Sequence, residues 1–258
     1  MRCSVIRLAV CVPALLALFG LFPPTVSAEP LGVDSLTTPA EPEKVIPEVQ
    51  EAIERFKKQD FNGALELLKK AAAANADLPP AQVVMAQLFS QANQGNAVRV
   101  SLEKAVVEAP ADPEAYVIIG DIAMAQGRVT EASLLFDKAQ QLLANFTKSP
   151  RRKAILEARN LSGLSAVAEA RGDWKKALER LTEWQKMEPK NAVCLQRLAR
   201  AQFQLKKPGE ALELLREAAK LDENVLTPEA QLARFYHEFG DEANAQIWFN
   251  NAVKVAPN

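Results

Sequence analysis

Apolar residues recur along most of the chain at intervals of three and four residues, and no segment alternates apolar and polar side chains at every second position. The first spacing places apolar side chains on one face of an α-helix, whereas a half-buried strand would need the second. Ala, Leu, Glu, Lys and Gln, all good helix formers, are abundant, and only 10 glycines occur. The pattern therefore predicts an all-α protein without a sheet.

The helical pattern repeats along the chain at a regular interval. The clearest unit runs from Pro113 to Phe146, and the same frame can be laid down at five other starts. Four of the five steps between starts equal the length of this unit, and the step before the fourth unit is longer. Six similar units predict six similar structural elements stacked in a row. The units start at residues 45, 79, 113, 158, 192 and 226.

Certain places within each unit carry residues whose size suits a helical hairpin. Small residues in the eighth and twentieth places let two helices approach closely, and a large residue in the twenty-fourth fills the space beyond them. Proline in the thirty-second place ends the second helix, and Gly127, Gly172 and Gly240 fall in the turn between helices. The twentieth place holds Ala64, Val98, Ala132, Ala177, Ala211 and Ala245, and the twenty-fourth holds Leu68, Leu102, Phe136, Leu181, Leu215 and Phe249.

These columns resemble the pattern of the tetratricopeptide repeat family, and the resemblance covers residues 45–258. It implies an all-α, right-handed superhelical solenoid of about six helical hairpins. A single hairpin cannot bury both of its faces, so each hairpin must stack on its neighbours. The resemblance also implies that the first helices of the units line a concave groove, which binds a peptide or protein partner.

Two departures from the family pattern change the expected structure. In the first unit, the fourth, seventh and eleventh places hold the charged residues Glu48, Glu51 and Arg55, and we expect a turn one residue shorter there. Eleven extra residues precede the fourth unit, where Ser149 and Pro150 resemble a helix start. Because eleven residues make about three α-helical turns, we expect an elongated first helix whose apolar face stays in phase.

Residues 1–28 have the features of a secretory signal peptide. Arg2 and Arg7 give a positive start, a short apolar run follows, and small residues fit a cleavage site after Ala28. The alternative is an uncleaved membrane anchor, although the apolar run is short for a span and contains Pro13. The sequence thus predicts an exported protein, either periplasmic or secreted, with no membrane span after cleavage. The signal peptide and the repeats resemble those of bacterial proteins.

Residues 29–44 are rich in proline and lack apolar periodicity, so we expect a flexible linker before the repeats. Cys3 and Cys11 leave with the signal peptide, which leaves Cys194 as the one cysteine of the mature chain. No intrachain disulfide is then expected. We expect Cys194 to be buried as a small apolar residue, and the alternative is pairing between two chains.

Composition and motifs argue against several classes of function. The chain has 31 basic and 32 acidic residues, whereas a nucleic-acid-binding surface needs a clear positive excess. His237 is the one histidine, so a metal site of the His/Cys type lacks ligands. Neither a glycine-rich phosphate loop nor a nucleophile elbow occurs. We therefore expect a protein that is not an enzyme and that uses no cofactor or metal.

The family resemblance places candidate partner-binding residues on the first helices of the units. Their charge changes along the predicted groove, from acidic in the third unit to basic in the last three. Arginine beside glutamine suits a carboxylate or an extended backbone, so we predict contact with an acidic or carboxylate-bearing segment of a partner. The alternative is that these are ordinary solvated side chains. The candidates are Asp121, Arg159, Gln196, Arg200, Arg234 and His237.

The last predicted helix carries Trp248, Phe249, Val253 and Val255, directly before the end of the chain. Arrays of this kind usually close with an extra polar helix, so we expect uncovered apolar surface there. Such patches often mark association sites, which predicts self-association through the C-terminal hairpin. The alternative is that Trp248 folds back onto its own hairpin.

Three functions remain open on the sequence alone. The first is an exported scaffold or adaptor that holds a partner in its groove. The second is an assembly factor for a cell-envelope machine, similar to the pilotins of type IV pili. Those are usually lipoproteins, and this chain lacks the residue that normally precedes a lipidated cysteine, because Val10 stands before Cys11. The third is an accessory repeat region of an enzyme system, although no catalytic domain accompanies it.

Overall fold

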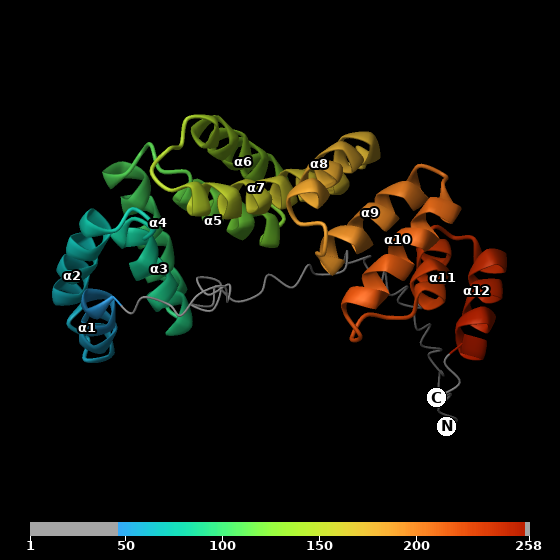
Figure 1. Ribbon diagram of the computed structural model, residues 1–258, viewed down its shortest axis with the longest axis horizontal. Helices are drawn as coiled ribbons and strands as arrows, with labels where there is room; N and C mark the ends of the chain where they lie inside the picture. Colours follow the sequence, from blue (N-terminus) through green and yellow to red (C-terminus); the bar gives the residue numbers. More distant parts are fainter. Residues whose placement is uncertain (1–45, 256–258) are drawn as a thin grey trace, which may run out of the picture.

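The computed structural model describes residues 46–255, which form twelve α-helices and no strand (Figure 1). The predicted signal peptide and the whole of the predicted linker lie outside the described residues. Within the described part of the chain, no helix has both the length and the apolar character that a membrane crossing requires. The helices are α1 (Pro47–Lys57), α2 (Phe61–Ala74), α3 (Ala81–Gln91), α4 (Gly95–Glu108), α5 (Glu114–Ala125), α6 (Val129–Ala144), α7 (Pro150–Ala170), α8 (Trp174–Met187), α9 (Ala192–Gln204), α10 (Pro208–Leu221), α11 (Pro228–Glu238) and α12 (Glu242–Val255).

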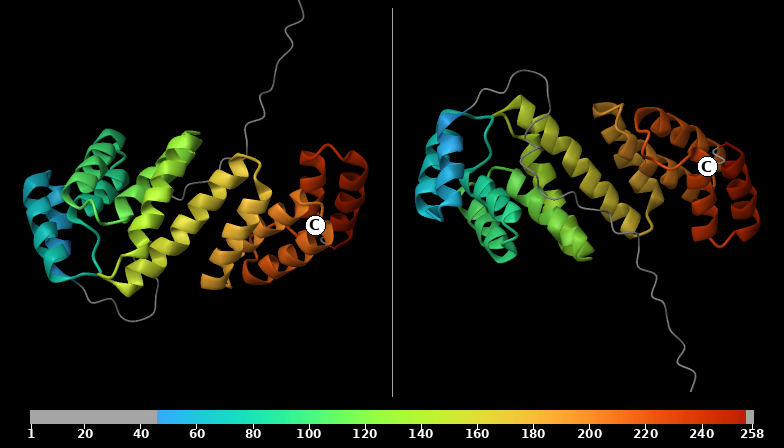
Figure 2. Two further views of the ribbon diagram at one scale, coloured as in Figure 1. Left: turned by 90° about the horizontal axis from the view of Figure 1, so that it is seen from above. Right: turned by 90° about the horizontal axis from the view of Figure 1, so that it is seen from below.

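Consecutive helices pair into six hairpins, and each hairpin packs against the next one along the chain. The hairpins lie side by side in chain order, from α1 and α2 at one end to α11 and α12 at the other (Figure 2). The row is arched, with α5 to α8 at its crown and both ends turned to the same side (Figure 1). The prediction of an all-α solenoid of about six hairpins is confirmed.

Every hairpin turn has three residues, and the middle one adopts a left-handed backbone. Gly127, Gly172 and Gly240 have φ values of 72°, 71° and 78°, which cost a glycine little because it has no Cβ. In the first hairpin, Gln59 takes the same conformation with φ 64°. The shorter turn expected in the first unit was therefore wrong. The first turn keeps the common geometry because Gln59 tolerates the left-handed region, and the Asp60 side chain then caps α2.

The small and large residues of the repeat meet as expected in the middle of the array. Phe136 on α6 is fully buried, and its ring lies between Gly120 on α5 and Gly163 on α7. Ala132, one turn earlier on α6, is also fully buried. The helices of this hairpin therefore approach each other closely at small residues, and one large side chain fills the space beyond them.

The elongated first helix of the fourth hairpin is confirmed. Helix α7 has 21 residues, against 11 to 13 in the other first helices. Ser149 caps it by accepting a hydrogen bond from the Arg152 backbone N–H, and Pro150 occupies the first turn. The Ser149 hydroxyl also donates to the Asp77 carboxylate in the α2–α3 loop. The extra turns of α7 thus reach back to a loop that lies far away in sequence.

A buried ionic cluster anchors the same end of α7. The Arg152 guanidinium donates to both carboxylate oxygens of Asp112, at 2.9–3.1 Å, and to Glu114 at 2.6 Å. All three residues are buried. Burial raises the pKa of Glu114 above its ordinary value of 4.5, and the charge of Arg152 offsets only part of that rise. Burial disfavours the charge of Arg152, but Glu114 and Asp112 outweigh this effect and raise the Arg152 pKa.

The two ends of the described array differ in polarity. At the first end, Glu51 and Arg55 of α1 form an exposed pair at 2.9 Å, so the charged residues of the first unit lie on an open helix face. At the other end, Ile247 and Val253 of α12 are 55% and 65% exposed. Trp248 packs against an apolar cluster that joins α9 and α10 of the preceding hairpin to α11 of its own hairpin, so its contacts extend beyond the fold-back that the alternative described. Self-association through this hairpin stays a prediction.

Candidate binding surface on the first helices

The candidate residues lie on the first helices of the last four hairpins. At the crown of the arch, α5 and α7 lie on the inner side and α6 and α8 on the outer side (Figure 1). Three ion pairs connect α5 to α7, α7 to α9 and α9 to α11 in turn, and we call them the ion-pair ladder. The ladder consists of Asp121–Arg159 at 2.7 Å, Glu169–Arg197 at 3.0 Å and Arg200–Glu238 at 3.0 Å.

The first pair joins two residues that the sequence had proposed as partner contacts. Both Nε and a terminal nitrogen of Arg159 lie 2.7 Å from Asp121 Oδ2. Burial raises the pKa of Asp121, while the Arg159 charge acts in the opposite direction. The structure thus gives each of these side chains a partner within the chain, and the pair fastens α5 to α7.

The second pair centres on Arg197, which sequence reasoning missed. Its Nε donates to Glu169, and its terminal nitrogens donate to Ser162 Oγ, Ser162 O and Ser165 Oγ at 2.8–3.1 Å. The guanidinium also lies over the Trp184 ring, 5.6 Å from its centroid. Arg197 is therefore saturated with acceptors. It stands in the sixth place of its unit. The family pattern assigns the groove to roughly the second, fifth, ninth, twelfth and thirteenth places, so the pattern gave no signal for it.

The third pair is built differently, because two arginines share one carboxylate. Glu238 Oε2 accepts one hydrogen bond from an Arg200 terminal nitrogen, and Oε1 lies 3.7 Å from an Arg234 terminal nitrogen. The Arg200 Nε is buried and has no hydrogen-bond acceptor. Arg234 is 53% exposed and has no other ion pair within the described residues. This end of the ladder thus carries a local excess of one positive charge.

The remaining two candidates flank this group. Gln196 is half-buried and lies one turn before Arg200 on the same face of α9. His237 Nδ1 lies 2.8 Å from Glu242 on α12, and both side chains are mostly exposed. The structure therefore brings Arg200 and Arg234 together around Glu238, while His237 is turned toward Glu242.

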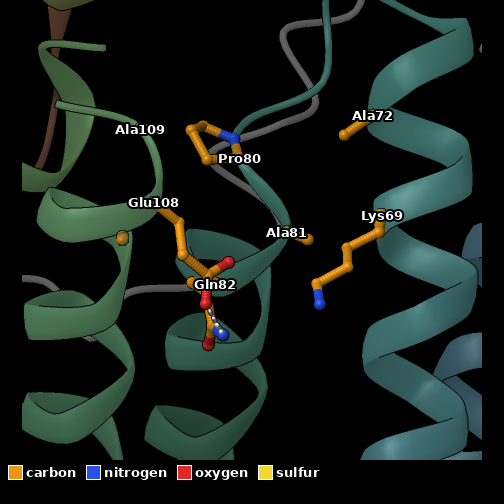
Figure 3. Close-up of a pocket in the computed structure, with 8 residues that line it drawn as sticks. Lys69, Ala72, Pro80, Ala81, Gln82, Glu108 and Ala109 are labelled. Carbon is orange, nitrogen blue, oxygen red and sulfur yellow. Dashed lines mark hydrogen bonds between the residues drawn. The ribbon is translucent and has the colours of Figure 1, made fainter. Parts of the chain in front are cut away.

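A hollow elsewhere on the array is too small to hold a typical ligand. It has a volume of about 180 Å³ and lies between α2 and α4 at the start of α3 (Figure 3), whereas small-molecule sites usually span about 300–1,000 Å³. Gln82 and Glu108 close one side of it through a 2.9 Å hydrogen bond. The described residues also contain no group of His, Cys, Asp or Glu side chains that could hold a metal ion.

Comparison with protein-family models gives three matches, each described as tetratricopeptide repeat. They cover residues 84–150, 168–234 and 230–258, which together make up more than half of the chain. The chain belongs to the tetratricopeptide repeat family. A comparison with curated proteins finds no significant match.

Solved structures of other tetratricopeptide repeat arrays share the fold of this one. PilW, described as a widely conserved type IV pilus biogenesis factor, has a TM-score of 0.54 and 18% sequence identity, with 81% of this chain and 92% of PilW covered. Pseudomonas aeruginosa PilF has a TM-score of 0.55 and 14% identity, covering 82% and 91%. YrrB, a TPR protein with an unusual peptide-binding site, has a TM-score of 0.53 and 16% identity, covering 75% and 94%.

Proposed function

We propose that this tetratricopeptide repeat protein is an exported interaction scaffold that holds a peptide or protein segment against its first helices. Arg200 and Arg234 contact a carboxylate of that segment, and Gln196 contributes a neutral hydrogen-bonding group. The single observation that carries this proposal is the sharing of one carboxylate, Glu238, by two arginines. Charge-assisted hydrogen bonds to carboxylates are about twice as strong as neutral ones, so an acidic partner segment gains most at this place.

The contrast along the ladder supports this choice of residues. Arg197 has an acceptor for each of its three nitrogens, and Arg159 faces Asp121 with two nitrogens. An arginine whose nitrogens already face acceptors in one of these two ways gains little binding energy from a further acceptor. Arg200 and Arg234 each make a single contact, with Glu238, so they are the two candidate arginines with the most donors left for a partner.

The test is binding of a labelled short polyglutamate peptide, followed by fluorescence anisotropy at low salt. Arg200→Glu combined with Arg234→Glu reverses the local charge and is expected to weaken binding by about tenfold or more. A matched control is Arg99→Glu with Arg216→Glu, since both of these arginines lie on second helices and are at least 48% exposed. Unchanged affinity in the first double variant, or equal losses in both, removes the proposed site.

Export is the second part of the proposal. It rests on the pattern of residues 1–28, which lie outside the described part of the chain, with residues 29–44 as linker and 45–258 as the repeat domain. N-terminal sequencing of protein recovered from a bacterial periplasm or culture medium is expected to begin at Glu29. A chain that still begins at Met1 in a membrane fraction would instead identify the segment as an uncleaved anchor.

A pilotin-like assembly factor is the alternative function. The similarity in length supports it, because the shared fold covers 92% of PilW and 81% of this chain. The two functions are separated by lipid analysis of the mature protein together with N-terminal sequencing. A lipidated N-terminal cysteine would favour the alternative, whereas an unmodified Glu29 would favour the scaffold.

A further inference from the structure

We infer that Glu238 is an internal competitor, which occupies the carboxylate site between Arg200 and Arg234 in the free protein and is displaced when a partner carboxylate binds. This inference rests on the proposed function and adds its regulation. When the partner binds, its carboxylate replaces that of Glu238 between the two arginines. The site therefore discriminates against partner segments that carry no negative charge.

The position of Glu238 in its helix is the first argument. Glu238 is the last residue of α11, where the partial negative charge of the helix end disfavours a carboxylate. Its side chain gains no backbone N–H there, because the free N–H groups of a helix lie at the other end. The two arginines are therefore the groups that hold the Glu238 side chain. No interaction with the helix end opposes its displacement by a stronger acceptor.

The geometry of the contact is the second argument. Glu238 accepts a single hydrogen bond from Arg200, at 3.0 Å, and lies 3.7 Å from Arg234. Arg152, by comparison, grips Asp112 through two nitrogens in a buried setting. The side chains of Arg200 and Glu238 are each 34% exposed, and ion pairs that water can reach contribute little to stability. Displacing Glu238 from the two arginines thus costs little.

The unused donors are the third argument. The Arg200 Nε lacks an acceptor while Glu238 binds a terminal nitrogen. The Nε is shielded from solvent, so the donors open to a partner are the two terminal nitrogens. Once Glu238 has left, a carboxylate that approaches the end of the guanidinium can accept from both terminal nitrogens together, which is the stronger bidentate arrangement. Glu238 reaches the guanidinium from α11 through one nitrogen only. The direction from which Glu238 approaches is fixed by α11, whereas that of a partner carboxylate is not. The partner carboxylate is therefore the better ligand.

The test compares the affinity of the polyglutamate peptide for the full chain and for Glu238→Gln. Removing the competitor is expected to tighten binding by about three- to fivefold, the value that corresponds to one exposed ion pair. Glu242→Gln is the matched control, because Glu242 is an exposed acid of the same hairpin that pairs with His237 instead. It removes the same charge and is expected to change affinity by less than about twofold.

A double-mutant cycle then assigns the gain to the arginines. In a chain carrying Arg200→Gln and Arg234→Gln, the substitution Glu238→Gln is expected to have no effect. If the arginine variants weaken binding but Glu238→Gln raises the affinity no more than Glu242→Gln does, Glu238 is not a competitor. The proposed scaffold function is then unaffected. A loss of affinity in Glu238→Gln also overturns the inference, since Glu238 would then be holding the arginines in place for the partner. Absence of binding in every chain, the unaltered one included, overturns both.

Discussion

The ring of Phe136 lies so close to the backbone of Gly163 that no side chain fits between them. A Cβ added at Gly163 would lie 2.4 Å from two carbons of the ring, and one added at Gly120 would lie 2.7 Å from it. The ring comes from α6, and the two glycines come from α5 and α7. The third and fourth hairpins therefore pack closely around this ring, in addition to the ionic contacts that Arg152 and Arg159 make between them.

Gly163→Ala is accordingly expected to destabilise the protein, although alanine favours a helix by about 1 kcal/mol more than glycine. Overpacking against a fully buried ring costs about 1–3 kcal/mol, because neither the ring nor the backbone of α7 has room to move. The measurement is the free energy of unfolding from urea titration, and we expect a net loss of up to about 2 kcal/mol.

The control for this substitution is Gly209→Ala in the first turn of α10, where nothing lies within 4 Å of the added methyl group. It is expected to leave stability unchanged or raised. Phe136→Leu in the same chain as Gly163→Ala is expected to cost less than the two single changes together, since the shorter side chain frees the space. Additive losses would show that the clash is not the cause.

Arg152 is expected to be the most sensitive charged residue of the array. Arg152→Met keeps the apolar stem but leaves Asp112 and Glu114 buried without their cation, which should cost about 3–5 kcal/mol. Arg151→Met changes the preceding, exposed residue and should change the free energy of unfolding by less than about 0.5 kcal/mol. Equal effects of the two substitutions in urea titration would mean that the buried cluster contributes no net stability.

The raised pKa of Glu114 predicts how stability depends on pH. A carboxyl group whose pKa is higher in the folded than in the unfolded chain binds more protons when folded, so its contribution is complete below the unfolded value, about 4.5, and is lost as the pH rises through the folded value. Glu114→Gln stays neutral and still accepts from Arg152. We therefore expect its stability relative to the unaltered chain to rise with pH above about 4.5. The check is urea titration of both chains between acidic and neutral pH, and a constant difference would contradict the assignment.

The fold could be predicted from the sequence because its cause is local and repeated. Each unit carries residues of similar size at the same places, so six weak signals add up, and a glycine marks three of the six turns. The first turn was misread because Glu48, Glu51 and Arg55 shift the apolar face of the first helix, which suggested a shorter turn, whereas Gln59 makes the same left-handed turn as the other units. A left-handed Gln leaves no trace in the apolar pattern.

The candidate site was only partly predictable, for a different physical reason. The family pattern says which residues lie on the first helices, but it does not say which charges meet across neighbouring helices. Asp121 and Arg159 were separate candidates, and the structure pairs them with each other. Arg152 arises from the inserted segment and Arg197 from a place that no repeat column covers. Pairing between hairpins depends on the distance between helices, which a repeat pattern does not contain.

Gln59→Gly is expected to stabilise the first hairpin. A residue with a Cβ pays about 1–2 kcal/mol in the left-handed region, and glycine gives back about 0.5–1 kcal/mol through its more flexible unfolded chain. The net gain in unfolding free energy should be up to about 1 kcal/mol. Lys58→Gly is the control, because Lys58 has φ −82° and gains nothing from glycine. A loss of stability in Gln59→Gly would mean that the Gln59 side chain contributes more than its backbone strain costs.

Cys194 is expected to be inert in the folded protein. Its side chain is fully buried and lies 3.5 Å from the Leu181 carbonyl oxygen, and burial raises the pKa of the thiol to about 12. At pH 8 only about one thiol in ten thousand is then ionised, and the thiolate is the reactive form. A chain that begins at Glu29 should therefore show no reaction with a disulfide reagent when folded and one reactive thiol in denaturant. Ala243→Cys, on the exposed side of α12, serves as the reactive control. Native reaction of Cys194 at a rate near that of the control would show that α9 opens from the array, and would restore pairing between chains as a use for this cysteine.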